Sequence, residues 1–254
     1  MAAIPNAFYK DQKPVRRPIW LEAFTGMDWL ALRASPVFYG FGVPRGDRSA
    51  VIVVPGFMGT DLYLQEIYWW LKRVGYRSYL SRIGRNAECL DLLVDRLSAT
   101  IDRAFTETGG KVHLIGHSLG GILATSAATI KSDRVASVIT LGSPFRGIRS
   151  HPVVLGMAQV VRKRIKREQA QTDQPACYTG YCTCDAVKAL QTSLPDSISR
   201  TAVYTKTDGI VDWRYCKYDD PAVDFEVIGT HAGLVFNPYV YHLIATRLAG
   251  LKTR

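Results

Sequence analysis

The residues with the clearest chemical potential form the pattern Gly116-x-Ser118-x-Gly120. A predicted apolar strand over 111–115 precedes this pattern, and a predicted small-residue helix over 122–130 follows it. In so tight a turn, side chains at the glycine positions would collide with the strand and the helix, and the serine is exposed in strained backbone geometry. The turn also places the hydroxyl near the positive end of a helix. We therefore predict that Ser118 is a nucleophile.

A serine hydroxyl needs a base, and the chain has five histidines. Four of them lie in a predicted strand, in the turn itself, in the segment 147–199 or on the last helix: His113, His117, His151 and His242. His231 differs because it directly follows a late strand, in a loop at the carboxyl edge of the predicted sheet that would face Ser118. We predict that His231 is the general base.

The base needs a carboxylate that orients it, and two aspartates follow the predicted strand 201–205. Asp208 is closer to the strand end, and its neighbour Gly209 permits a tight turn. Asp212, beside Trp213, fits a structural role better. We therefore predict Asp208 as the acid, in the chain order serine, aspartate, histidine.

An acyl-transfer reaction also needs donors for the developing oxyanion. The N–H of Leu119, which directly follows the predicted nucleophile, is one candidate. The second is expected in the loop Pro55–Gly59 after the first strand, where Phe57 is the better candidate and Met58 the alternative.

Alternating elements must position these residues. Strands are predicted over 50–54, 76–80, 111–115, 135–141, 201–205 and 224–228, and helices over 20–33, 62–74, 89–106, 122–130 and 239–248. The run 50–54 is apolar throughout and β-branched from 51 to 54, as expected of a central parallel strand that is buried on both faces. This alternation indicates α/β architecture with helices on both faces of a mostly parallel sheet. Residues 1–254 are expected to form one domain, with 147–199 as a helical cap insertion.

Composition and charge limit the classes of binding partner and the compartment that we expect. The 254 residues carry a net charge of +10, but the basic residues are scattered apart from the run 162–167, so nucleic-acid binding is not expected. No apolar run reaches the roughly 20 residues that cross a bilayer, and no signal-peptide pattern is present. The cytoplasm is the expected compartment.

The segment 152–166 is a basic amphipathic pattern with two interpretations. It can be a cap helix that packs its apolar side over the substrate pocket, or a helix that contacts a membrane or lipid surface. The first is the favoured interpretation, and the second stays open.

Four cysteines cluster in or near the insertion: Cys177, Cys182, Cys184 and Cys216. Free thiols, a disulfide from Cys182 or Cys184 to Cys216, and a zinc site all remain open from spacing alone.

With these residues in hand, the chain resembles the α/β-hydrolase superfamily, and within it the bacterial lipase and esterase branch. Four segments carry the likeness: 54–59, 116–121, 141–147, and 207–209 together with 229–231. The resemblance implies the α/β-hydrolase fold with a cap insertion after the sixth strand of that fold. It also implies hydrolysis of a small, apolar carboxylic ester through an acyl-serine intermediate, without cofactor or metal.

One departure from this family concerns the oxyanion loop, where Pro55-Gly56 stands in place of the His-Gly of many lipases. It leaves the choice between Phe57 and Met58 open. An acyltransferase or thioesterase that uses the same triad is the alternative function. A binding module without activity is disfavoured because all three triad residues are present.

Overall fold

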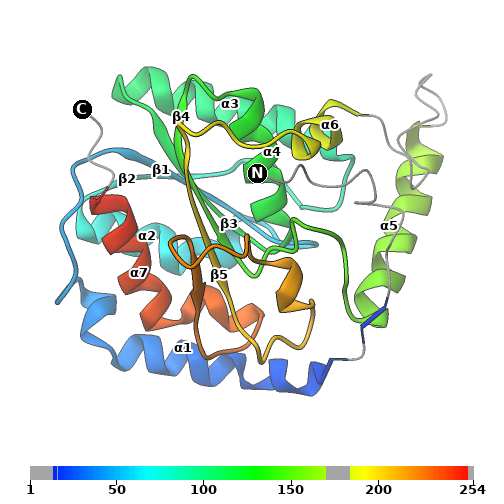
Figure 1. Ribbon diagram of the computed structural model, residues 1–254, viewed down its shortest axis with the longest axis horizontal. Helices are drawn as coiled ribbons and strands as arrows, with labels where there is room; N and C mark the ends of the chain where they lie inside the picture. The colour runs from blue at the N-terminus through cyan, green and yellow to red at the C-terminus, as the bar shows by residue number, and fades with distance from the viewer. Residues whose placement is uncertain (1–13, 16, 170–183, 251–254) are drawn as a thin grey trace.

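A parallel sheet of six strands forms the centre of the computed structural model, which describes residues 14–15, 17–169 and 184–250 (Figure 1). The strands are β1 (Ala50–Val54), β2 (Arg77–Leu80), β3 (Val112–His117), β4 (Val135–Leu141), β5 (Ser199–Tyr204) and β6 (Asp224–Glu226). Their order across the sheet is β2-β1-β3-β4-β5-β6, and each neighbouring pair is parallel. The predicted strands are confirmed, with small differences at their ends.

The strand β1 shows how the sheet organises two cores. Successive side chains of a strand point to opposite faces. Val51 and Val53 pack into a cluster with α2 (Gln65–Val74) and α7 (Pro238–Ala249). Ala50, Ile52 and Val54 pack on the other face, against α3 (Leu90–Thr108), α4 (Leu119–Ile130) and α6 (Asp185–Gln191). The helices therefore cover both faces, as the continuous β-branched run predicts.

The expected cap insertion contains two helices between β4 and β5. They are α5 (Pro152–Gln169) and α6, and the described residues between 142 and 198 add no further strand to the sheet. The strand before the insertion, counted as the sixth in the family pattern, is the fourth along this chain. In Figure 1, α5 stands apart from the two helical layers, at one end of the sheet. Within the described ranges, no helix has both the length and the apolar character that a membrane crossing needs.

The N-terminal helical segment differs from an ordinary surface helix, because polar side chains face the protein and several apolar ones face the solvent. It begins as the 3-10 helix η1 (Ile19–Phe24) and continues as α1 (Thr25–Ala34), which agrees with the helix predicted over 20–33. Trp20 is 65% exposed and Met27 63% exposed, so several of its large apolar side chains face outward, whereas Leu32 is buried in the core. Its partly buried polar side chains face the loops that follow β5 and β6 instead.

Candidate active site

Ser118 occupies the turn between β3 and α4 in a strained conformation. Its φ is 52° and its ψ is −123°, a region that residues with a side chain rarely adopt. The glycines explain why the turn can be so tight. A Cβ at Gly116 would lie 2.4 Å from the Cα of Gly121, and a Cβ at Gly120 would lie 2.3 Å from the carbonyl oxygen of Val54. The predicted collisions with the helix and the sheet are therefore present.

His231 and Asp208 form a buried pair at the carboxyl edge of the sheet. Their Nδ1 and Oδ2 atoms lie 2.7 Å apart, and the side chains are 6% and 1% exposed. The other oxygen, Oδ1, accepts hydrogen bonds from the N–H groups of Ile210 at 2.8 Å and Val211 at 2.7 Å. Three donors thus fix the orientation of this carboxylate toward the imidazole.

The charge around His231 favours its protonated form. Burial disfavours the imidazolium, but the negative charge of Asp208, the hydrogen bond to it and the charge of Glu22 outweigh burial and raise the pKa of His231 above 6.5. A base with a raised pKa accepts a proton from a hydroxyl more readily. The pair is thus suited to general-base chemistry.

Asp212, the rival carboxylate, has other partners. Its Oδ1 accepts from the Arg17 guanidinium at 3.2 Å and from the backbone N–H of Arg214 at 3.2 Å, where it caps a short 3-10 helix. These contacts agree with the prediction from sequence, in which Asp208 faces the histidine and Asp212 has a structural role.

His113 is remote from this pair. It lies within β3, where its Nδ1 is 2.8 Å from the hydroxyl oxygen of Ser137, and burial lowers its pKa to about 4. His151 accepts from the Val153 N–H at 3.3 Å, at the start of the cap helix α5, and His242 belongs to α7.

His117 links the turn at Ser118 to the predicted base, His231. Its Nε2–H donates to the carbonyl oxygen of His231 at 3.0 Å, and the centroids of the two imidazole rings are 4.9 Å apart. Since His117 directly precedes Ser118, the base lies beside the turn. Among the described residues, no hydrogen bond joins the Ser118 hydroxyl to His231 itself. The structure thus brings the three predicted residues to one edge, with the histidine–aspartate pair formed.

The loop after β1 distinguishes the two candidate oxyanion donors. The Met58 N–H donates to the carbonyl oxygen of Asn86 at 2.8 Å, so it is already engaged. The N–H groups of Phe57 and Leu119 donate to no acceptor in the part of the chain that the structure describes. A Cβ at Gly56 would lie 3.1 Å from the Cβ of Ser118, so this loop passes directly beside the serine. Geometry favours Phe57 as the second donor.

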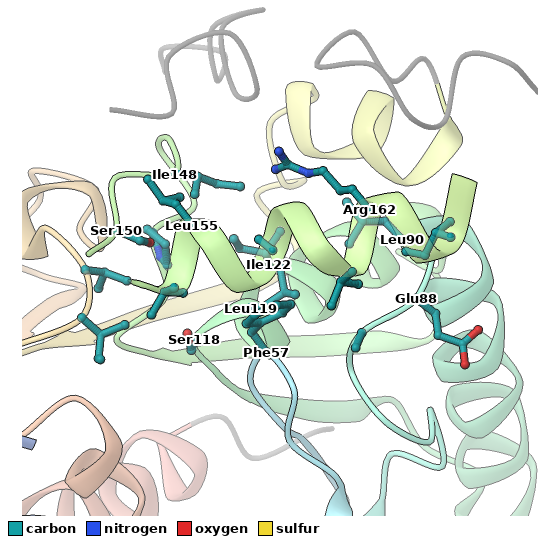
Figure 2. Close-up of a pocket in the computed structure, with 18 of the residues that line it drawn as sticks. Phe57, Glu88, Leu90, Ser118, Leu119, Ile122, Ile148, Ser150, Leu155 and Arg162 are labelled. Carbon is teal, nitrogen blue, oxygen red and sulfur yellow. The ribbon is translucent and has the colours of Figure 1, made fainter. Parts of the chain in front are cut away.

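An apolar cavity of about 170 Å³ opens beside the serine. Its walls include residues that follow β1, β3, β4 and β5, and α5 covers it (Figure 2). From α5 come Val154, Leu155, Ala158, Val161, Arg162 and Ile165. In Figure 2, Ser118, Leu119 and Phe57 lie below this helix. The favoured interpretation of the segment 152–166, a cap helix over a pocket, agrees with this arrangement.

Sequence reasoning missed two polar residues that hold the site loops. The side chain of Asn86 is fully buried, and its Nδ2 donates to the carbonyl oxygen of Pro55 at 2.7 Å. Glu22, on η1, accepts backbone hydrogen bonds from the loops that carry Asp208 and His231. The only signal for Glu22 in the sequence is that it interrupts an apolar stretch, and Asn86 gives none.

Cys216 is a buried free thiol whose pKa is raised by burial, so the disulfide considered for it is not formed. Cys177 and Cys182 lie outside the described residues. Within the described ranges, no group of three or more histidine, cysteine or acidic side chains could hold a metal ion.

Comparisons with known proteins place the chain in a family and show its fold. The model of a family described as "PGAP1-like alpha/beta domain" matches residues 81–212, just over half of the chain. A triacylglycerol lipase of Burkholderia plantarii is 30% identical over 131 residues, which is 48% of this chain and 37% of the lipase. A triacylglycerol lipase of Pseudarthrobacter phenanthrenivorans is 32% identical over 109 residues, 39% of this chain and 34% of the lipase. The chain therefore spans little more than a third of the length of these relatives.

Solved structures match over a larger part of the chain. A soluble variant of monoglyceride lipase from Saccharomyces cerevisiae aligns with a TM-score of 0.58 at 14% identity, covering 84% of this chain and 91% of that one. A structure from a study of two metagenome-derived lipolytic enzymes, LipS and LipT, aligns with a TM-score of 0.56 at 17% identity, covering 83% and 96%. At such identities the likeness concerns the fold, and it confirms the expected α/β-hydrolase fold.

Proposed function

Because this chain belongs to the family of the PGAP1-like alpha/beta domain, we propose that it is a carboxylic-ester hydrolase that acts through an acyl-serine intermediate. One observation carries the proposal. The buried pair of His231 and Asp208, 2.7 Å apart, lies beside the strained turn that carries Ser118. A nucleophile, a base and an orienting acid at one sheet edge are the parts that acyl transfer through serine requires.

The proposed reaction has two halves. The Ser118 Oγ attacks the ester carbonyl carbon while the His231 imidazole takes the hydroxyl proton, and the Asp208 carboxylate stabilises the imidazolium. The N–H groups of Phe57 and Leu119 donate to the oxyanion of the tetrahedral intermediate. When the intermediate collapses, the alcohol leaves with the proton from His231. Water then attacks the acyl-serine, His231 takes its proton and returns it to Ser118, and the carboxylic acid is released.

The substrate that we propose is a small ester with an apolar acyl or alcohol group. The cavity beside Ser118 is lined mainly by aliphatic side chains, including Leu119 and Ile122 from α4 and Ala158 and Val161 from α5. Such a lining gains free energy by removing a hydrocarbon chain from water, about 0.8 kcal/mol for each buried methylene group. It offers few polar partners to a charged acyl group.

A series of p-nitrophenyl esters with graded acyl length tests this function. We expect the wild-type protein to hydrolyse them and Ser118→Ala to lose turnover by several orders of magnitude. Equal turnover by both proteins would contradict the proposal. No feature of the described residues favours the acyltransferase or thioesterase alternative over hydrolysis.

We also propose that the outer side of α5 contacts a lipid surface. Val153, Met157 and Val160 are 56%, 43% and 68% exposed, at helical spacing and on the helix that covers the pocket. Exposed basic residues, Lys163 and Arg167, follow near the end of the helix. Apolar side chains beside basic ones are typical of helices that lie in a membrane interface.

Flotation with vesicles of phosphatidylcholine and phosphatidylglycerol tests the lipid contact. The triple variant Val153→Ser, Met157→Ser, Val160→Ser should no longer float with the vesicles. Trp69→Ser is the matched control, because Trp69 is 55% exposed on a different helix, α2. If the wild-type protein does not float with the vesicles, or if the triple variant floats as well as wild type, the proposed lipid contact is wrong.

A further inference from the structure

The N-terminal segment carries a carboxylate that bridges the two loops of the proposed acid and base. The Oε1 of Glu22 accepts hydrogen bonds from the N–H of Gly209 at 2.9 Å and from the N–H of His231 at 3.0 Å. Its Oε2 accepts from the N–H of Ala232 at 2.9 Å. One side chain therefore ties together the residue after Asp208, the proposed base and the residue after that base.

The packing around this carboxylate is close enough to require glycine. A Cβ at Gly209 would lie 2.9 Å from the Oε1 of Glu22 and 3.0 Å from the carbonyl oxygen of Pro18. Gly209 does not have a positive φ, and the close approach of Glu22 gives a reason for glycine at this position. The acid loop is thus shaped to receive the N-terminal segment.

A second carboxylate of the same segment holds the base loop. The Oδ2 of Asp28 accepts from the hydroxyl of Thr230 at 2.8 Å and from its N–H at 3.3 Å. The Thr230 Oγ in turn accepts from the N–H of Gly233 at 2.8 Å. A Cβ at Gly233 would lie 1.8 Å from Asp28 Oδ2, so this position also requires glycine. Both loops therefore depend on the inward, polar side of the segment 19–34.

From these contacts we propose that Glu22 is a positioning residue for the reaction, which holds the acid and base loops at a fixed separation and places a negative charge near the imidazolium. The proposal rests on the ester-hydrolase function above. The N-terminal segment lies outside the alternating strands and helices. In this proposal it contributes to catalysis through its contacts with His231. Glu22 itself is not among the residues that line the cavity.

The charge of Glu22 shifts the pKa of His231 in a definite direction. In the part of the chain that the structure describes, several charged and titratable groups face His231 and its neighbours. They are Asp208 after β5, Glu22 on η1, His117 at the end of β3, Tyr63 on η3 (Asp61–Leu64), and Asp28 through Thr230. Of these, Asp208 and Glu22 raise the pKa of the imidazole. His117 is neutral because burial, followed by the proximity of His231, lowers its pKa to about 3. Removing the Glu22 charge therefore lowers the pKa of His231.

The experiment compares wild type, Glu22→Gln and Glu22→Ala. The kcat of both variants for a p-nitrophenyl ester should fall by about 10- to 100-fold with little change in KM, because small misplacements of catalytic groups cost rates of that order. The acid limb of kcat/KM against pH should move to lower pH in both. Glu226→Gln is the control, since it removes a surface carboxylate that pairs with Lys206. Rates are divided by the concentration of active sites, which is titrated with an organophosphate, so that unfolded protein does not lower the measured kcat.

An NMR titration of His231 supplies a readout that needs no turnover, with the signal assigned by its absence in His231→Gln. A lower imidazole pKa in Glu22→Gln than in wild type supports the proposal, and an unchanged pKa with unchanged kcat overturns it. If wild type has no esterase activity but the pKa shift appears, the proposed function fails while the positioning contact stands. If Glu22→Ala does not fold, Glu22→Gln still decides the question.

Discussion

The Nε2–H of His117 donates to the backbone carbonyl oxygen of His231 across 3.0 Å, so the residue before the proposed nucleophile holds the backbone of the proposed base. His117 is 5% exposed, and its Nδ1 has no hydrogen-bond partner among the residues that the structure describes. Burial lowers the pKa of His117 to about 3, so the ring is neutral, and its Nε2–H provides the hydrogen bond that orients it. This relationship explains why the histidine inside the turn does not act as a base itself.

His117→Phe removes that donor and keeps an aromatic ring of similar size. The His231 carbonyl oxygen then keeps only the longer hydrogen bond from the N–H of Leu234, at 3.4 Å. The loss of one buried hydrogen bond costs about 0.5–1.5 kcal/mol. We expect the free energy of unfolding, measured by urea titration, to fall by that amount. Because His117 carries no charge in wild type, the acid limb of kcat/KM should stay in place, in contrast to Glu22→Gln. A clear shift of the limb would show that His117 titrates.

The pH dependence of wild type follows from the raised pKa of His231. The imidazole must be neutral to accept the serine proton, so activity is present above its pKa and is lost as pH falls through it. We expect the acid limb of kcat/KM to lie above pH 6.5. An acid limb well below that value would mean that Asp208 and Glu22 do not act on the base as described.

Asp208→Asn keeps the shape of the acid and removes its charge. The amide can no longer favour the productive tautomer or stabilise the imidazolium, so kcat should fall by about 10⁴-fold, as for the equivalent change in serine proteases. Asp212→Asn is the control, because its carboxylate contacts Arg17 and Arg214 instead of the histidine. A larger loss in Asp212→Asn than in Asp208→Asn would reverse the assignment of the acid.

The two glycines Gly121 and Gly156 give opposite predictions for the same change to alanine. A Cβ at Gly121 would lie 2.0 Å from the Ser143 Oγ, whereas a Cβ at Gly156 in α5 meets nothing within 4 Å. We expect Gly121→Ala to lower the Tm strongly. Gly156→Ala should raise stability by about 0.5–1 kcal/mol, because alanine favours the helix. Similar melting curves for the two variants would contradict the packing of the turn.

Ala158→Phe tests the cavity as the acyl site. The side chain at 158 lines the cavity from α5, so added bulk there should shift the preferred p-nitrophenyl ester toward shorter acyl chains. Gln159→Phe adds the same bulk at an exposed position of the same helix and should leave the preference unchanged. An unaltered chain-length profile in Ala158→Phe would place the acyl group elsewhere.

The parallel sheet and the turn at Ser118 could be predicted from sequence because their signals are local. The run Ala50–Val54 can be buried on two faces only in a covered sheet, and the glycines around Ser118 are needed within a few residues of it. Asp208 could be favoured over Asp212 because the distance from a strand end is also a local property.

The contacts of Glu22 and Asn86 could not be predicted, because they join segments far apart in the chain. Glu22 meets Gly209 and His231 only after the N-terminal segment packs on the sheet edge. The spacing of Trp20 and Met27 predicts a helix but not which side faces the protein. Here Trp20 and Met27 face outward, and the carboxylates of Glu22 and Asp28 face the acid and base loops.

The central claim is that Ser118 is an acyl-accepting nucleophile activated by His231. Incubation with a fluorophosphonate, followed by digestion and mass spectrometry, tests it most directly because the adduct is located on one residue. We expect one adduct for each chain, on the peptide that contains Ser118. It should be absent in Ser118→Ala and form far more slowly in His231→Gln. An adduct on another serine, or equal labelling of Ser118→Ala and wild type, would contradict the account.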